Sequence, residues 1–249
     1  MDSDRAARIW TAVALRAMRE RTPISPAHAC LECVEALTVG GAGLMFATGS
    51  EALEPVYFTG PEAEEADTLQ TTLGEGPGFD AVASGQPILA DNMASSSSMR
   101  QWPMLAAHMA RLGVGAIHSF PLALGAIRVG ALNLYSFIPR ELDSDNLVDA
   151  LVYADTALLL TLDARSGIDT AANGGISNGQ TPALWRAEVH QAAGMVAAQL
   201  GLSVLDALVR LRAHAYSHDM SLTALAREVV ERRVRFDTEY DADSGKGEP

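Results

Sequence analysis

The alternation of apolar and polar positions predicts a mixed fold over the first two thirds of the chain. Apolar residues recur at helical spacing in four segments, at residues 4–21, 25–39, 99–113 and 144–164, and Ser144 is the predicted N-cap of the last. Short apolar runs bounded by turn residues predict strands at residues 41–48, 54–59, 87–93, 116–124 and 127–137. Strands in hairpins with helices at both ends favour an α+β fold, an antiparallel sheet flanked by helices.

The last part of the chain is predicted to be an all-α three-helix bundle. Residues 181–201 repeat apolar side chains at helical spacing and stop at Gly201. Ser203 is the predicted N-cap of a second helix, with Asp206 completing an acidic variant of the capping box. Ser221 is the predicted N-cap of a third helix.

Two polar stretches set the predicted domain boundaries. Residues 164–182 are rich in Gly, Ser, Asn and Thr and lack apolar periodicity, which is typical of a flexible linker. Residues 237–249 are polar and charged, which is typical of a disordered tail. The sequence therefore predicts an N-terminal domain at residues 1–163 and a helical domain at residues 183–236.

Charge distinguishes these two domains. The 249 residues carry a formal net charge of −13, which argues against indiscriminate binding of nucleic acid by the whole molecule. Residues 183–236 contain seven Arg and five acidic residues, a net charge of +2, so the remainder carries −15. A slightly basic helical domain beside an acidic domain suggests two units with different partners.

The scarcity of lysine excludes several functions. The only Lys is Lys246, in the polar tail. A phosphate-binding GxxxxGK loop, a pyridoxal-phosphate enzyme and a phosphoacceptor receiver domain each need a Lys elsewhere. No apolar run is long enough to span a membrane and the start has no signal-peptide pattern, so we expect a cytoplasmic protein with no membrane association.

No pattern in the chain predicts an enzyme or a metal site. Cys30 and Cys33 form a CxxC pair, but a zinc site needs two further ligands, so we interpret them as part of an apolar stripe. His108 and His118 stand alone among apolar residues, and no nucleophile elbow is present. We expect no catalytic residue, no metal and no cofactor.

Two stretches of the N-terminal domain carry a resemblance to a known family. "TLGEGPGFDAVASGQPILADN" at residues 72–92 and "GVGAIHSFPLALGAIRVGALNLYS" at residues 113–136 resemble the signature loop and the strand hairpin of GAF domains. The resemblance spans residues 6–164 and implies a sensory domain whose sheet lies beneath a pocket for an unidentified small molecule. Some relatives carry a Cys where this chain has Gly78, so a thiol-based role is not available there. The alternative is a domain that binds nothing and only dimerises.

The C-terminal domain resembles ANTAR domains, which are three-helix RNA-binding units. The matching residues are Gln191, Ala192, Gly194, Gly201, Ser203, Ala207, Leu211, Arg212, Ala215, Leu222 and Ala226. The resemblance implies a homodimeric regulator that prevents transcription termination by holding paired small hairpins in nascent mRNA. The chain departs from the family at Ala193, often a Lys there, which we interpret as the loss of one phosphate contact.

Spacing on the third helix separates solvated charges from candidate RNA contacts. Glu228 and Arg232 are spaced for an i,i+4 ion pair, as are Arg227 with Glu231 and Glu231 with Arg235. Arg212 is different, because it lies in the apolar arc of its helix beside Tyr216. It either reaches an acid on another helix, such as Glu188, or faces RNA, whose bases stack on Tyr and Arg planes.

The predicted RNA-binding residues surround that position. The hydroxyls of Ser221 and Thr223 lie at a helix N-terminus, a natural phosphate site. The full predicted set is Gln191, Arg210, Arg212, His214, Tyr216, His218, Ser221, Thr223 and Arg227. Two alternatives stay open: a DNA-binding helix-turn-helix factor with a GAF sensor, and a dimerisation module without catalytic activity.

Overall fold

The structure is a computed structural model in which residues 3–48, 52–125, 127–165, 182–218 and 220–236 are described. The chain divides into two compact units, Met1–Gly175 and Ile176–Pro249. The predicted tail and residues 166–181 of the predicted linker lie outside the described residues. None of the described helices combines the length and the apolar character that a bilayer-spanning helix requires.

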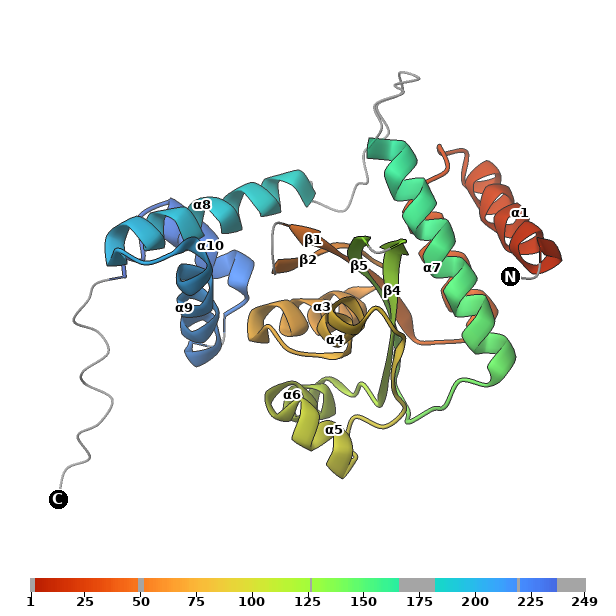
Figure 1. Ribbon diagram of the computed structural model, residues 1–249, viewed down its shortest axis with the longest axis horizontal. Helices are drawn as coiled ribbons and strands as arrows, with labels where there is room; N and C mark the ends of the chain where they lie inside the picture. The colour runs from red at the N-terminus through yellow and green to blue at the C-terminus, as the bar shows by residue number, and fades with distance from the viewer. Residues whose placement is uncertain (1–2, 49–51, 126, 166–181, 219, 237–249) are drawn as a thin grey trace. The chain divides into compact units, whose positions relative to one another are not determined.

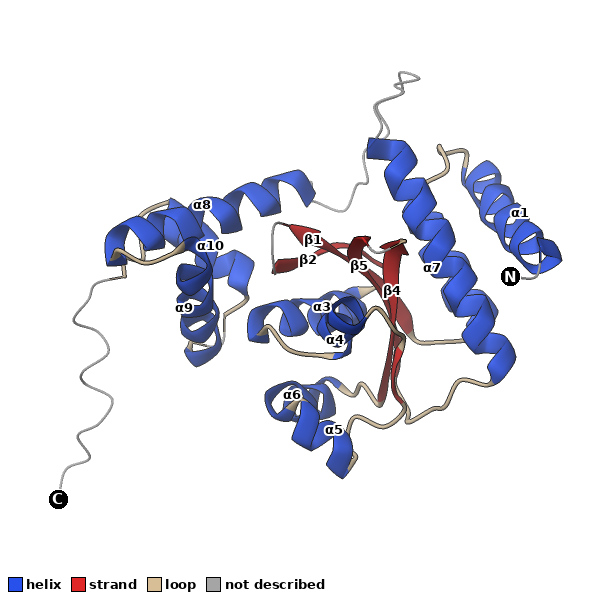
Figure 2. Cartoon of the chain, in the orientation of Figure 1, coloured by secondary structure: helices blue, strands red, loops and turns tan. Residues whose placement is uncertain are grey.

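The N-terminal unit alternates helices with short strands, as Figure 2 shows. Its helices are α1 (Ser3–Glu20), α2 (Pro26–Leu37), α3 (Pro61–Leu73), α4 (Pro77–Ser84), α5 (Ser96–Gln101), α6 (Pro103–Leu112) and α7 (Ser144–Arg165). Its strands are β1 (Gly41–Thr48), β2 (Ala52–Phe58), β3 (Ile88–Ala90), β4 (Ala116–Leu124) and β5 (Ile127–Ser136). The predicted α+β architecture is confirmed, and all five predicted strands are present.

One antiparallel sheet organises this unit into three layers. The strand order is β2-β1-β5-β4-β3, and all four pairings are antiparallel. The helices α2 and α7 pack on one face, with α1 outside them, and α3, α4 and α6 cover the other (Figure 1). Because side chains alternate between the two faces of a strand, β2, β4 and β5 each contribute to two separate cores.

The core beneath α2 and α7 is almost wholly apolar. Leu44, Phe120 and Leu134 point into it from the sheet. Cys30 and Cys33 are fully buried in the same core, which confirms that they belong to an apolar stripe. Burial raises the pKa of both thiols, so they stay protonated and unreactive.

Two local predictions are wrong for identifiable reasons. The segment 99–113 is not one helix but two, because Trp102 has non-helical backbone angles (φ −133°, ψ 70°) and Pro103 begins a new helix. The N-cap of α7 is Asp143 rather than Ser144, since Asp143 Oδ1 accepts the backbone N–H of Asn146 at 2.7 Å.

The C-terminal unit contains three helices, α8 (Pro182–Leu200), α9 (Val204–Ser217) and α10 (Leu222–Val230). Gly201 ends α8 with a positive φ of 65°, as a glycine at that position allows. Ser203 accepts the N–H of Asp206 at 3.1 Å and Ser221 accepts the N–H of Ala224 at 3.1 Å, so both predicted N-caps are confirmed. The buried faces of the three helices meet in one core, formed mainly by Ala192, Val196, Ala207, Leu211, Ala215, Leu222, Leu225, Ala226 and Val229.

Two glycines give a matched test of this packing. A Cβ at Gly130 would lie 2.0 Å from the backbone oxygen of Met45, so we expect Gly130→Ala to destabilise the N-terminal unit by about 3 kcal/mol. A Cβ at Gly194, which is exposed within α8, would meet nothing within 4 Å, so Gly194→Ala stabilises the C-terminal unit by about 1 kcal/mol. Urea unfolding measures both free energies, and two effects of the same sign would contradict the packing described.

Candidate functional site

A buried polar cluster lies between α3 and the sheet in the N-terminal unit. Asp67 and Gln70 share one face of α3 at i,i+3 spacing, and Asn133 and Tyr135 share one face of β5 at i,i+2 spacing. All four residues are fully buried. Buried polar side chains of this kind require partners, and here they provide them for one another.

The carboxyl group of Asp67 is the centre of the cluster. Its Oδ1 accepts a hydrogen bond from Asn133 Nδ2 at 2.8 Å and another from the hydroxyl of Tyr135. Its Oδ2 is buried without a hydrogen-bond partner. A Cβ at Gly43 on β1 would lie 1.7 Å from that oxygen, so only glycine lets the carboxyl group lie against the strand.

The remaining hydrogen bonds extend the cluster to α4 and β4. Gln70 donates from Nε2 to the Tyr135 hydroxyl at 2.9 Å and accepts the backbone N–H of Gly78 at 3.0 Å. Ser119 donates to Oδ1 of Asn133 at 2.6 Å. The motif loop at residues 74–78 is therefore tied directly to the polar centre of the sheet.

Burial raises the pKa of Asp67 to about 7, although the hydrogen bonds from Tyr135 and Asn133 oppose this by favouring the ionised form. Burial and the neighbouring Asp67 raise the pKa of Tyr135 well above its usual value, so its hydroxyl remains a donor. The cluster thus holds one carboxyl group that exchanges its proton near neutral pH. Such a group responds to any ligand or movement that changes its surroundings.

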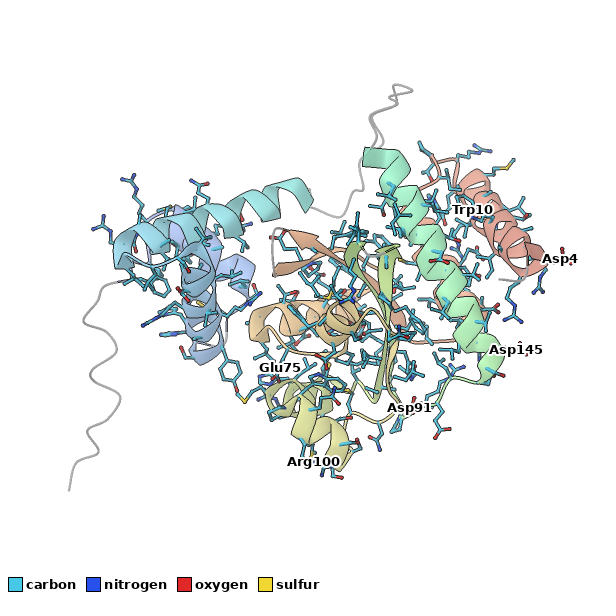
Figure 3. The ribbon with its side chains drawn as sticks, viewed as in Figure 1. Asp4, Trp10, Glu75, Asp91, Arg100 and Asp145 are labelled. Carbon is cyan, nitrogen blue, oxygen red and sulfur yellow. The ribbon has the colours of Figure 1, made fainter. Side chains whose placement is uncertain are left out.

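Two carboxylate side chains, one in the motif loop and one on α4, attach α5 and α6 to this part of the chain. Glu75, labelled in Figure 3, comes from that loop, and its Oε1 accepts the backbone N–H groups of Met104 at 3.1 Å and Leu105 at 2.9 Å. It therefore caps the N-terminus of α6, where Trp102 supplies no side-chain cap. Asp80 on α4 accepts hydrogen bonds from Gln101 Nε2 at 2.8 Å and Trp102 Nε1 at 3.1 Å. These hydrogen bonds hold α5 and α6 beside α4.

Sequence reasoning missed both Asp67 and Gln70, because it missed α3. The buried face of α3 carries Asp67, Gln70, Thr71 and Thr72 beside the small residues Ala63 and Ala66, so the apolar periodicity of the helix is weak. Other signals of the helix were present: Pro61 at its first position, acidic residues in its first turn, and Gly74 after its end.

In the C-terminal unit, the predicted residues of α9 lie on two sides of the helix. Val209 is 60% exposed and Tyr216 is 38% exposed. Arg212, half-buried, is three residues after Val209 and four before Tyr216, so these three share one side, whereas Arg210 and His214 lie on another side, each two residues from Arg212. The first side joins an exposed aromatic ring and a short apolar surface to one guanidinium group.

The two histidines at the end of α9 contact each other. The rings of His214 and His218 are stacked with centroids 4.0 Å apart, and the ring of Phe236 lies 4.9 Å from that of His214. Burial and His218 lower the pKa of His214, which favours its neutral form. His214 is half-buried while His218 is exposed, so His218 presents the outer ring of the stack.

The charges of α10 are paired differently from the prediction. Arg233, beyond the end of α10 at Val230, bonds both carboxylate oxygens of Glu228, at 2.6 and 2.7 Å, in place of the predicted partner Arg232. Arg227 lies 3.5 Å from the carboxylate of Glu188 on α8. Arg227, predicted to contact RNA, thus already has an acidic partner.

The other predicted residues lie on two elements. Gln191 is exposed on α8, and Ser221 caps α10 through its hydroxyl. The side chain of Thr223 lies outside the described part of the chain. Ala193 is buried in α8, and the interpretation that a phosphate contact is lost there stays a prediction.

Comparison with known proteins finds distant structural likenesses and no sequence relative. No protein-family model and no curated protein matches the chain. A GAF domain of a phosphoenolpyruvate-protein phosphotransferase from Coxiella burnetii is 12% identical, with a TM-score of 0.47 over 65% of this chain and 96% of that one. A GAF domain of the corresponding Acinetobacter protein is 11% identical, with a TM-score of 0.48 over 66% and 94%.

An enzyme structure is similar to the same extent. A free methionine-R-sulfoxide reductase from Neisseria meningitidis, solved with its substrate, is 15% identical, with a TM-score of 0.45 over 68% of this chain and 96% of that one. Structures this distant identify neither a ligand nor an activity. They include a catalyst as well as domains of signalling proteins, and their matches cover 55–68% of the chain.

The titration of Asp67 has a measurable consequence. Its folded-state pKa of about 7 lies above the unfolded-state value of about 3.9, so the folded protein binds the proton more tightly. This group therefore makes the folded state less stable as pH rises from about 4 to 7, by up to about 4 kcal/mol. The quantity to compare is the difference in free energy of unfolding between the wild type and Asp67→Asn. We expect this difference, wild type minus variant, to decrease as the pH rises from about 4 to 7.

Chemical denaturation at a series of pH values measures that difference. Glu65→Gln, which removes an exposed carboxyl group from the same helix, is the matched control. A difference for Asp67→Asn that does not change, or that rises with pH, would contradict the placement of this carboxyl group.

Proposed function

We propose that this chain is an RNA-binding regulator of transcription termination. In this proposal its C-terminal unit holds small hairpins in nascent mRNA, and its N-terminal unit senses a small molecule and controls that binding. The resemblance to GAF and ANTAR domains suggests this division of labour. The chain has no assigned catalytic role in the proposal.

The side of α9 that carries Tyr216 is the observation on which RNA binding rests. Unpaired bases in RNA loops stack on aromatic rings and on guanidinium planes, and they do not need a strongly positive surface. Tyr216 and Arg212 share this side at i,i+4 spacing, whereas Arg210 lies on another side of the helix and the exposed ring of His218 follows at its end. A domain with a net charge of only +2 fits recognition of loop bases better than recognition of a duplex backbone.

The ion pairs of α10 argue against DNA reading by that helix. A recognition helix presents its polar side chains to base edges in the major groove. Here Arg227 lies beside Glu188, and Arg233 is held by Glu228. Duplex DNA is therefore the competitor that the binding experiment must include.

The polar cluster around Asp67 is the proposed sensing element. A buried carboxyl group with one oxygen lacking a hydrogen-bond partner would favour a ligand that donates a hydrogen bond or carries positive charge. Because that oxygen lies against β1 at Gly43, such a ligand would have to separate α3 from the strand.

Tandem hairpins provide the direct test of the proposal. Two linked weak sites gain affinity through effective concentration, so we expect an RNA with two hairpins to bind at least ten-fold more tightly than either hairpin alone. Gel-shift titration of the full chain measures both affinities, with duplex DNA as competitor. Equal affinity for one and two hairpins, or preferential displacement by DNA, would contradict the proposal.

Replacing Tyr216 tests the stacking surface itself. Loss of one base–aromatic contact costs about 1–3 kcal/mol, so we expect Tyr216→Ala to weaken RNA binding roughly ten-fold or more. Because Tyr216 is exposed, the helical content measured by circular dichroism should remain that of the wild type. Arg235→Ala, at an exposed position after α10, is the control and should change affinity less. If the control variant lost more affinity than Tyr216→Ala, α9 would not be the recognition surface.

A further inference from the structure

The end of α9 carries two histidines at a spacing that no other two histidines of the chain share. Of the six histidines in the sequence, only His214 and His218 are four residues apart. Both side chains therefore leave the same side of the helix, and their rings are stacked with centroids 4.0 Å apart and planes inclined by 15°. Two histidines at i,i+4 on one side of a helix have the spacing that allows both rings to bind one metal ion.

Hydrogen bonding fixes the position of the proton on the ring of His218. Its Nδ1 lies 2.9 Å from the backbone carbonyl oxygen of His214, and a carbonyl oxygen only accepts, so Nδ1 carries the proton. The hydroxyl of Ser217 donates to the same carbonyl oxygen at 3.0 Å, so it acts as a second acceptor for Nδ1, 2.9 Å away. The lone pair of His218 is then on Nε2. A histidine that donates from one ring nitrogen to a carbonyl oxygen is oriented to bind a metal through the other.

The ring of His214 is held by packing. It lies between 4 and 5 Å from the rings of two neighbours, His218 at 4.0 Å and Phe236 at 4.9 Å. Within the described residues neither ring nitrogen of His214 has a hydrogen-bond partner. A half-turn of the ring about its Cβ–Cγ bond therefore presents either nitrogen to an ion beside Nε2 of His218. Burial and His218 lower the pKa of His214, which favours the neutral form that a metal ion requires.

The separation of the two rings suits a shared ion. Bonds of about 2.0–2.1 Å from zinc to nitrogen, at the tetrahedral angle, hold two nitrogen ligands about 3.4 Å apart. Rings whose centroids are 4.0 Å apart reach this separation when their facing edges close by about half an ångström. Small rotations of the two side chains supply that movement without a change in the helix.

We propose that His214 and His218 together bind a divalent transition-metal ion, Zn²⁺ in particular, with water in its remaining coordination positions. Imidazole nitrogen is a ligand that Zn²⁺, Cu²⁺ and Ni²⁺ share, whereas Mg²⁺ and Ca²⁺ prefer oxygen. In the part of the chain that the structure describes, no three His, Cys, Asp or Glu side chains gather closely enough to hold a metal. The site is therefore open to solvent, unlike a closed structural zinc site. This proposal departs from the expectation, drawn from the sequence, that the chain holds no metal.

An ion in this position acts on the junction between α9 and α10. His218 is the C-cap of α9, and its backbone N–H donates to the carbonyl oxygen of His214 at 3.1 Å. Because the two rings meet only while this last turn is helical, a bound ion stabilises the turn by an amount that rises with the concentration of free metal. Ser221, the N-cap of α10, follows three residues later. Metal binding goes beyond the proposed function and does not depend on RNA binding.

Calorimetric titration of the untagged full chain with ZnCl₂ tests the proposal. We expect one ion per chain, and we expect His214→Gln and His218→Gln each to raise the dissociation constant at least ten-fold, since each removes one of two linked ligands. Titration with MgCl₂ should give no heat that depends on these histidines. Both side chains are at least partly exposed and glutamine is a good helix former, so circular dichroism should show the variants folded.

His108→Gln is the matched control. His108 on α6 is also partly exposed, and its Nδ1 lies 2.8 Å from the backbone oxygen of Met104 four residues earlier, but no second histidine stands at i,i+4. Its replacement should change the dissociation constant less than two-fold. In the wild type, zinc should shift the imidazole resonances of His214 and His218 in NMR spectra and leave those of His108 in place.

Three results would overturn the proposal. The first is a wild type that binds zinc no more tightly than the double variant His214→Gln, His218→Gln. The second is a single variant that retains the affinity of the wild type, because a shared ion needs both rings. The third is zinc-induced shifts in the wild type that are confined to histidines other than this pair.

Discussion

The N-terminal unit is organised by the burial of one carboxyl group, that of Asp67, against the backbone of β1 at Gly43. A carboxyl group in this position needs donors, and Asn133 and Tyr135 supply them from the strand beside β1. Gln70 then links the cluster to the motif loop through Gly78. The polar face of the sheet, the position of α3 and the start of α4 therefore depend on a single desolvated group.

Part of the positive charge of the C-terminal unit is paired within the unit. Arg227 and Arg233 contact acidic side chains there, which reduces the positive surface that the composition suggested. One side of α9 carries an exposed ring, a short apolar surface and the half-buried Arg212. This combination fits recognition of unstacked bases, in which stacking contributes more than attraction to phosphate.

Local patterns were sufficient to predict most elements but not the polar centre. The strands, the helical caps at Ser203 and Ser221, and the buried CxxC pair follow from periodicity and from short-range chemistry. Helix α3 does not, because its buried face is polar and its partners Asn133 and Tyr135 lie more than sixty residues away. The pairing of Arg227 with Glu188 was missed for the same reason, since it joins helices that are distant in sequence.

Photo-crosslinking of the full chain to the RNA that accompanies it in the cell tests the central claim most directly. The crosslinked peptides can be identified by mass spectrometry, and the attached RNA by sequencing. The account predicts crosslinks on α9 at Tyr216 and at its neighbour His218, to RNA that contains paired hairpins. Crosslinks confined to the N-terminal unit, or an absence of enriched RNA, would contradict it.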